Sequence, residues 1–291
     1  MNHVLPIFRK TWRILFDAAR RLIEDDGLAL AGNIAFCMIL ALFPFLILLT
    51  ALAGFLGNPQ LAETVVNYLL SVAPHEIAGP LVPEIHRLLT VPRTDLLTLG
   101  ILLTLWTASG AVESVRVGLN RAYEFNERRS YWFRLAENIV FVIGGAIVLL
   151  VLAATIVLGP VLWNKIIYFI PAMKTFTPAF HFLRYPVSLS LLAGALILGH
   201  LFLPVYRHDL RELWPGILLT MILWLAGAIG YSQYLSHFST LSSMYAGLTG
   251  FIIALTFLYL SAALLIWGGE LNQILIARKQ AAQQVREYYR A

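Results

Sequence analysis

The chain has 291 residues, of which 59% are hydrophobic and only 13% are charged, and its formal net charge is +5. Soluble globular proteins hold about 45–50% apolar and about 25% charged residues, so this composition excludes an ordinary water-soluble domain. The single cysteine, Cys37, excludes an intramolecular disulfide. No short apolar core with a small-residue cleavage site is visible at the N-terminus, and we expect no cleavable signal peptide.

The first part of the chain predicts an amphipathic helix. Over residues 3–25, apolar side chains such as Leu5, Phe8, Trp12 and Leu15 recur at helical spacing, and basic residues occupy the other face. Such a helix either lies in the interface of the inner leaflet or packs on the cytoplasmic end of a helix bundle.

Six apolar segments follow, most of them as long as the hydrocarbon core of a bilayer requires. They cover residues 27–57, 96–111, 138–163, 187–205, 215–235 and 245–272. Continuous apolar runs predict helices, because the strands of a membrane barrel alternate apolar and polar residues. The second segment is the shortest and should continue as a helix beyond the membrane surface. We therefore predict an all-α membrane protein with six transmembrane helices.

The remaining residues complete one predicted domain over 1–291. It comprises the interfacial helix over 1–26, the bundle over 27–272 and a cytoplasmic tail over 273–291. Two amphipathic stretches at 63–72 and 81–89 predict short external helices. The prolines and aromatic residues of 164–186 favour an ordered external cap.

The positions of the basic residues predict the orientation. Sixteen of the 21 lysines and arginines lie on one side: before the first apolar segment, in the loops that follow the second and fourth segments, or after the last segment. Positive residues accumulate on the cytoplasmic side of membrane proteins. Both termini should therefore be cytoplasmic, in a bacterial inner membrane, and the basic charge requires no nucleic-acid partner.

Several polar residues fall at membrane depth, most of them in the half that this orientation places near the cytoplasm. They are Asn33, Glu113, Arg116, Asn120, His200, Glu270 and Asn272. Ionisable groups at membrane depth usually mark a substrate or ion pathway, which predicts a polar cavity open to the cytoplasm. The alternative is that these side chains only bond one helix to another. Glu270 would then be an interfacial carboxylate paired with an arginine.

Pro44 interrupts the first apolar segment and predicts a kink there, because proline removes a backbone donor from the helix. Motifs of enzyme chemistry are missing. The seven histidines are scattered, and neither a metal-binding His-Glu-x-x-His motif, a phosphate-binding loop nor a nucleophile elbow occurs. We expect no enzyme activity, metal or cofactor.

Three stretches resemble the YihY/BrkB family of bacterial inner-membrane proteins. The first stretch is residues 33–45. The second is residues 105–123 together with residues 129–132. The third consists of three separate segments, residues 214–216, 245–247 and 268–272. One mild departure is Ala246, which separates Tyr245 from Gly247. The resemblance implies six membrane helices and cytoplasmic termini. Members have carried a ribonuclease BN label, which looks like a misassignment, and others have been linked to serum resistance or to export across the inner membrane.

The leading hypothesis is a transporter or flippase-like protein for a lipid or small solute. Glu270 would bind a proton or a cationic group, and Arg116 an anionic headgroup. The rival is a membrane scaffold that docks an envelope-assembly protein through its external loops. Membrane lipids are expected partners under both hypotheses, and neither fixes whether the protein forms homo-oligomers.

Overall fold

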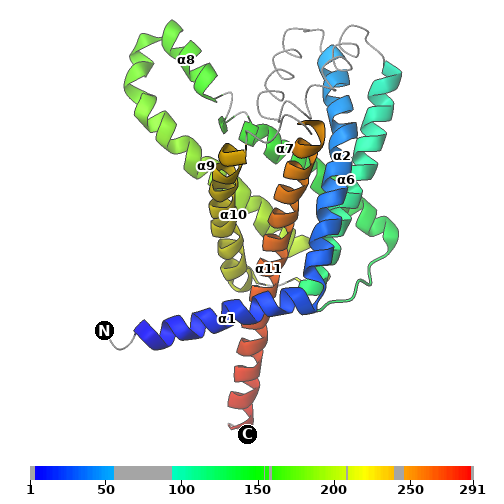
Figure 1. Ribbon diagram of the computed structural model, residues 1–291, viewed down its shortest axis with the longest axis vertical. Coiled ribbons are helices and arrows are strands. Elements are labelled where there is room, and N and C mark those ends of the chain that lie inside the picture. Colours follow the sequence, from blue (N-terminus) through cyan, green and yellow to red (C-terminus); the bar gives the residue numbers. More distant parts are fainter. Residues whose placement is uncertain are drawn as a thin grey trace.

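The computed structural model describes residues 4–55, 94–153, 155–156, 159–207, 209–238 and 246–289. Within these ranges all regular secondary structure is helical. Helix α1 lies across one end of the bundle, and the C-terminal part of α11 extends past it (Figure 1).

The first two helices join at a sharp corner. Helix α1 spans Val4–Glu24, and α2 spans Gly27–Phe55. Between them Asp26 has a positive φ of 57°, which reverses the helical path and lets the chain turn from α1 into α2. Pro44 lies inside α2, which remains one helix across it, and the kink predicted there stays a prediction. The predicted external helices at 63–72 and 81–89 lie outside the described residues.

The next helices differ from the predicted boundaries. Helix α6 spans Thr94–Ala122, so the expected extension of the second segment is confirmed. The third segment, predicted over 138–163, is wrong at both ends. Helix α7 spans Tyr131–Ala153, and a separate helix α8 spans Gly159–Phe169. Proline is favoured in the first turn of a helix and lacks an N–H donor, so the Gly-Pro pair of α8 starts a new helix.

The segment 164–186 is ordered and is divided among the end of α8, a short 3₁₀ helix η2 and the first part of α9; an external cap formed by this segment stays a prediction. The helix η2 spans Pro171–Phe176, and α9 spans Thr177–Phe202. The fourth predicted segment therefore begins too late. The rings of Trp163 on α8 and Phe180 on α9 stack with centroids 4.4 Å apart and hold this hairpin together.

The last two helices are longer than predicted. Helix α10 spans Leu210–Phe238 and accommodates Pro215 near its N-terminus. Helix α11 spans Ala246–Tyr288, so the residues predicted as a separate tail after Asn272 continue the last helix. We call the end of the bundle formed by α1, the loops 123–130 and 203–207 and the part of α11 after Asn272 the basic end.

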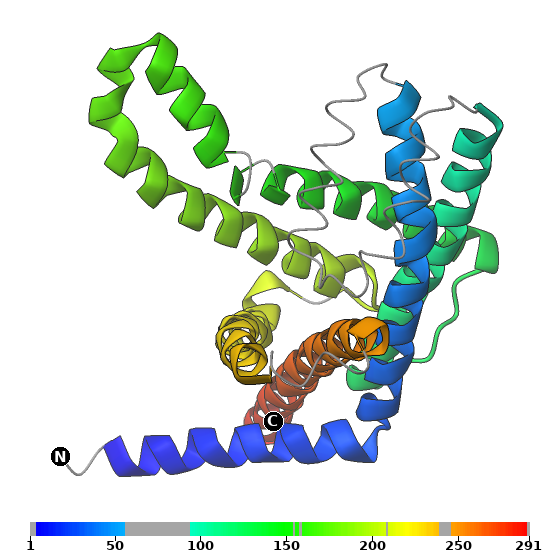
Figure 2. The same ribbon diagram turned by 45° about the horizontal axis from the view of Figure 1, so that its top comes forward.

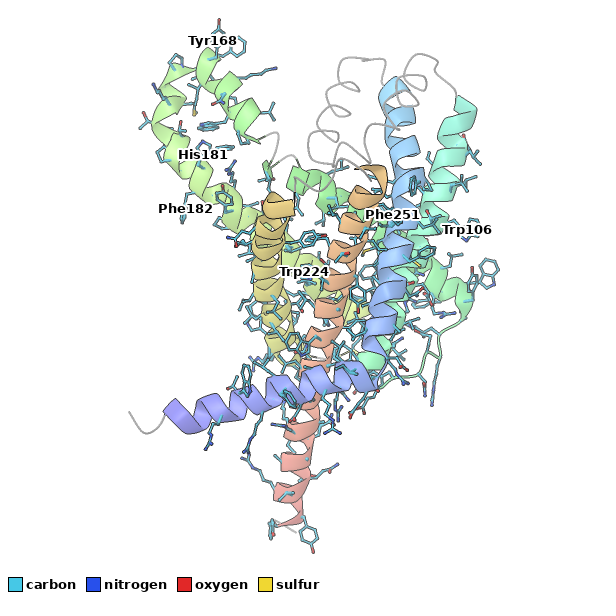
Figure 3. All side chains as sticks on the ribbon, viewed as in Figure 1. Trp106, Tyr168, His181, Phe182, Trp224 and Phe251 are labelled. Carbon is cyan, nitrogen blue, oxygen red and sulfur yellow. The ribbon has the colours of Figure 1, made fainter. Side chains whose placement is uncertain are left out.

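Within the part of the chain that the structure describes, six helices are long and apolar enough to cross a membrane, which confirms the predicted number. The spans are Gly27–Phe45, Thr98–Ala122, Tyr131–Leu152, Pro171–Phe202, Leu210–Tyr231 and Phe251–Tyr288. Trp106, Tyr168 and Phe182 point away from the bundle in Figure 3 and are strongly exposed. Exposed apolar side chains of this size fit a surface covered by lipid rather than by water.

The core lies mainly among α2, α6, α10 and α11, and α1 and α9 also contribute buried side chains. Trp224 points from α10 toward α11 (Figure 3), and its Nε1 donates to the Ser261 carbonyl oxygen at 2.9 Å. The backbones of α10 and α11 meet at Gly216 and Gly268. A Cβ on Gly216 would collide with the carbonyl oxygen of Gly268, and a Cβ on Gly268 with Thr220 Oγ1. Close approach of small residues is a common way in which membrane helices associate.

Replacing Gly268 with alanine should therefore destabilise the protein by about 1–3 kcal/mol through overpacking. The measurement is thermal unfolding of the purified variant in detergent. Gly194→Ala is the matched control, because nothing lies within 4 Å of a Cβ built there. Equal unfolding temperatures for both variants would contradict the close crossing.

Candidate functional site

An ionic network joins α6 to α7 around Arg116, whose side chain is fully buried. Its Nη2 donates to Asn138 Oδ1 at 2.5 Å and lies 3.1 Å from Glu137 Oε2. Its Nε lies 3.7 Å from Glu113 Oε2. Glu113 in turn accepts hydrogen bonds from Arg134 Nη1 at 2.5 Å and from Asn138 Nδ2 at 2.9 Å. Two carboxylates therefore balance the buried guanidinium.

The loop after α6 extends this network to α9. Arg129 contacts Glu127 and Glu137 and donates to the carbonyl oxygens of Phe202 and Leu203 at the end of α9. A guanidinium at that position satisfies carbonyl groups that have no partner within the helix. Asn120 donates to Glu127 Oε2 at 3.1 Å and accepts from the Val205 backbone N–H at 2.9 Å. The loop thus ties three helices together.

Glu127 has an unusually acidic carboxyl group. Partial burial raises the pKa of this carboxyl, but hydrogen bonds from the side chain and backbone of Arg129, its charge and the Asn120 amide outweigh burial and lower the pKa to about 2. Glu127 therefore stays ionised at any physiological pH and holds Arg129 in place.

A second, neutral network crosses the bundle near Asn272. The Asn272 Oδ1 accepts from the Gly216 backbone N–H at 2.7 Å, and its Nδ2 donates to the Leu213 carbonyl at 3.0 Å and to Tyr123 Oη at 3.1 Å. Tyr123 Oη also lies 2.9 Å from His200 Nδ1. All three side chains are buried, so α6, α9, α10 and α11 are joined by one chain of hydrogen bonds.

Asn33 stands apart from both networks. Its Nδ2 donates to Ser114 Oγ at 3.0 Å, which links α2 to α6. The Asn33 side chain is exposed, and Cys37 one turn away is half-buried.

Glu270 differs from every residue above. Its side chain is 0% exposed, and neither carboxylate oxygen has a hydrogen-bond partner among the described residues. Arg21, Asp25, Arg121 and Glu124 act on it electrostatically. These four charges already pair with one another, because Arg21 Nη1 lies 2.5 Å from Glu124 Oε1 and Arg121 Nε lies 3.8 Å from Asp25 Oδ1.

The predicted site residues therefore fall into four groups. Glu113, Arg116 and Asn120 belong to the ionic network, and His200 and Asn272 to the neutral one. Asn33 and Glu270 each stand alone. A single cavity shared by all seven stays a prediction. Among the described residues, no group of three or more His, Cys, Asp or Glu side chains is placed to hold a metal ion.

Six side-chain partners in these networks were missing from the prediction. They are Tyr123, Glu127, Arg129, Arg134, Glu137 and Asn138. Glu137 and Asn138 carry a detectable signal, since they are polar residues at the start of an apolar segment. Glu127 and Arg129 lie in a polar loop, where charged residues are ordinary.

Comparison with known proteins identifies the family. A family model described as "Virulence factor BrkB" matches residues 18–288. The chain belongs to the BrkB family. A relative in Bacillus subtilis (strain 168), named "Putative ribonuclease-like protein YfkH", is 28% identical over 255 residues, which cover 88% of this chain and 92% of YfkH. No solved structure matches the chain.

The match to the BrkB family covers both networks and Glu270. The family resemblance inferred from the three sequence stretches is therefore confirmed, and the chain is a multi-pass membrane protein of this family.

The Glu127–Arg129 contact predicts a specific response to acid. The folded-state pKa of Glu127 is depressed from 4.5 to about 2, so its stabilisation is complete above the unfolded value and is lost as pH falls toward 2. Glu127→Gln should therefore flatten the decline of unfolding temperature below pH 4.5, as followed by thermal unfolding across this range. An unchanged pH profile would contradict the role of this ion pair.

Proposed function

We propose that this BrkB-family protein transports a lipid or a small solute across the membrane, and that Glu270 binds a proton or a cationic group during transport. We further propose that the basic end faces the cytoplasm of a bacterial inner membrane. The distribution of lysine and arginine supports this orientation.

The burial of Glu270 without a partner supports the transport proposal most strongly. A buried ionised carboxylate that lacks a hydrogen bond and a dedicated cation is costly by several kcal/mol. The carboxylate therefore favours a proton or a bound cation. Since ionisable residues inside a membrane protein commonly mark such pathways, Glu270 is the best candidate for the coupling site.

The ionic network around Arg116 has a different assignment in this proposal. Glu113 and Glu137 lie against the guanidinium, and they would repel an anionic headgroup that approached it. We therefore assign Arg116 to holding α6 and α7 together, and place substrate or ion binding at Glu270.

Two other functions remain to be separated from transport. The scaffold hypothesis depends on external residues 58–95, most of which lie outside the described residues, and it predicts loss of function when that loop is replaced while Glu270→Gln has no effect. The name of YfkH suggests a ribonuclease as a second candidate. Cleavage of RNA by the purified protein, abolished by a point substitution, would support that function.

The first test compares Glu270→Gln with Glu113→Gln. Glutamine keeps the shape of glutamate but cannot ionise. At Glu270 it should leave thermal stability unchanged or raised, because it removes the need to bury a titratable group. At Glu113 it removes a charged partner of Arg116 and Arg134, while Glu137 still balances Arg116, and it should lower the free energy of unfolding by about 1–3 kcal/mol. Unfolding of Glu270→Gln would instead indicate a structural carboxylate.

The second test identifies the cargo. Native mass spectrometry of the purified protein should detect a co-purifying lipid or solute in the wild type that is lost in Glu270→Gln and retained in Arg116→Lys. Retention of the same ligand by Glu270→Gln would contradict binding at this carboxylate.

A further inference from the structure

Helix α1 has four faces that differ in the side chains they present. One face packs against the bundle: Ala18 lies with Leu271 and Ile274 of α11, and Leu22 lies with residues of α2, α6 and α11. This packed face fixes the rotation of α1 about its own axis and decides which side chains point outward.

An apolar stripe on α1 has no cover from the described part of the chain. Trp12, Phe16 and Ile23 are 64%, 64% and 66% exposed. At about 100° per residue they fall within about 40° of one another and about 120° from the packed face. We call these three residues the apolar stripe.

A row of arginines borders the apolar stripe on the side away from the packed face. Arg9, Arg13 and Arg20 are all exposed and lie about 60° around the helix from the stripe. Arg20 Nε donates to Glu24 Oε1 at 2.7 Å, whereas Arg9 and Arg13 have no ion-pair partner among the side chains that the structure describes. We call these three residues the arginine row.

The acidic residues of α1 lie beyond the arginine row. Asp17 pairs with Arg278 of α11 at 2.7 Å, on the part of α11 that extends past α1 (Figure 1). Around the helix the order is thus packed face, apolar stripe, arginine row and carboxylates. Asp17 is turned toward the α11 extension, and Glu24 pairs with Arg20, so Arg9 and Arg13 together with the stripe remain as one basic, apolar surface.

The position of α1 brings this surface to the end of the membrane spans. The helix leads through one short turn into α2, whose span begins at Gly27. In both ribbon views the N-terminal part of α1 extends beyond α10 and α11 (Figures 1 and 2). Because the α2 span begins at Gly27, we expect this surface to lie beside the bundle at the level of the lipid headgroups.

We propose that the apolar stripe and the arginine row bind the anionic phospholipids of the surrounding leaflet. The stripe would enter the boundary of the acyl chains, and the guanidinium groups would lie at the level of the phosphates, which they recognise through paired hydrogen bonds. Each basic residue near an anionic leaflet strengthens attachment about fivefold. This inference does not depend on the role of Glu270.

The test measures the depth of α1 in the full-length protein. In a Cys37→Ser background, a nitroxide is placed at Phe16→Cys in the stripe or at Glu24→Cys on the acidic face. Each protein is reconstituted into vesicles of phosphatidylcholine alone and of phosphatidylcholine mixed equally with phosphatidylglycerol. Collision with oxygen and with a water-soluble nickel chelate then reports whether the label lies in lipid or in water.

The label at position 16 should favour oxygen, and more strongly in the anionic vesicles, while the label at position 24 should favour the nickel chelate. Adding Arg9→Gln and Arg13→Gln should remove the difference between the two vesicles. The control pair Arg207→Gln and Arg286→Gln removes the same amount of charge from the basic end and should leave the difference between the two vesicles unchanged. Equal depth at position 16 in both vesicles, or a difference that survives the Arg9 and Arg13 substitutions, would overturn the proposal.

Discussion

The bundle depends on the close crossing of α10 and α11. Gly216 and Gly268 let the two backbones meet, and this approach brings the Asn272 amide within reach of both the Gly216 N–H and the Leu213 carbonyl. The second Asn272 donor then reaches Tyr123, which positions His200. A larger side chain at either glycine would separate the helices and break this chain of hydrogen bonds.

A bilayer offers no water to polar groups, so a membrane protein must satisfy them internally. Asn272 and Tyr123 meet this requirement with neutral hydrogen bonds. Arg116 meets it in part: its Nη2 bonds Asn138 and two carboxylates balance its charge, whereas its Nε and Nη1 have no hydrogen-bond partner among the described residues. Glu270 lies in the half of the bundle next to the basic end, as these residues do, but neither of its carboxylate oxygens has a hydrogen-bond partner among the described residues. Asn272, Tyr123 and Arg116 therefore hold helices together, whereas we propose that the partner of Glu270 is a proton or a cation.

Much of the architecture could be predicted from the sequence, because the number of spans follows from apolar runs of bilayer length. The helix boundaries were harder to predict near prolines. Pro178 and Pro215 look like helix breaks in the sequence. Pro178 instead lies in the first turn of α9, where the missing donor costs little, and α10 continues through Pro215. Gly159 and Pro160 do start a new helix, which divided one predicted segment into two.

The sequence identified the candidate residues, because polar residue types stand out in apolar segments. It could not predict which of these residues contact one another. Glu270 stands out as a charge in an apolar segment, whereas its lack of a partner depends on helices that are distant in sequence. Asn272 and Tyr123 are 149 positions apart, and a single sequence taken by itself contains no signal for that contact. Arg129 and Glu127 belong to a polar loop, so a search at membrane depth overlooks them.

Infrared titration of the reconstituted protein tests the central claim about Glu270 most directly. A protonated carboxyl group has a C=O stretching band separate from that of a carboxylate. The account predicts a buried carboxylic-acid band in the wild type that titrates with pH or cation concentration and disappears in Glu270→Gln, while Glu113→Gln retains it. Identical spectra for the wild type and Glu270→Gln across the titration would contradict the assignment of Glu270 as the binding group.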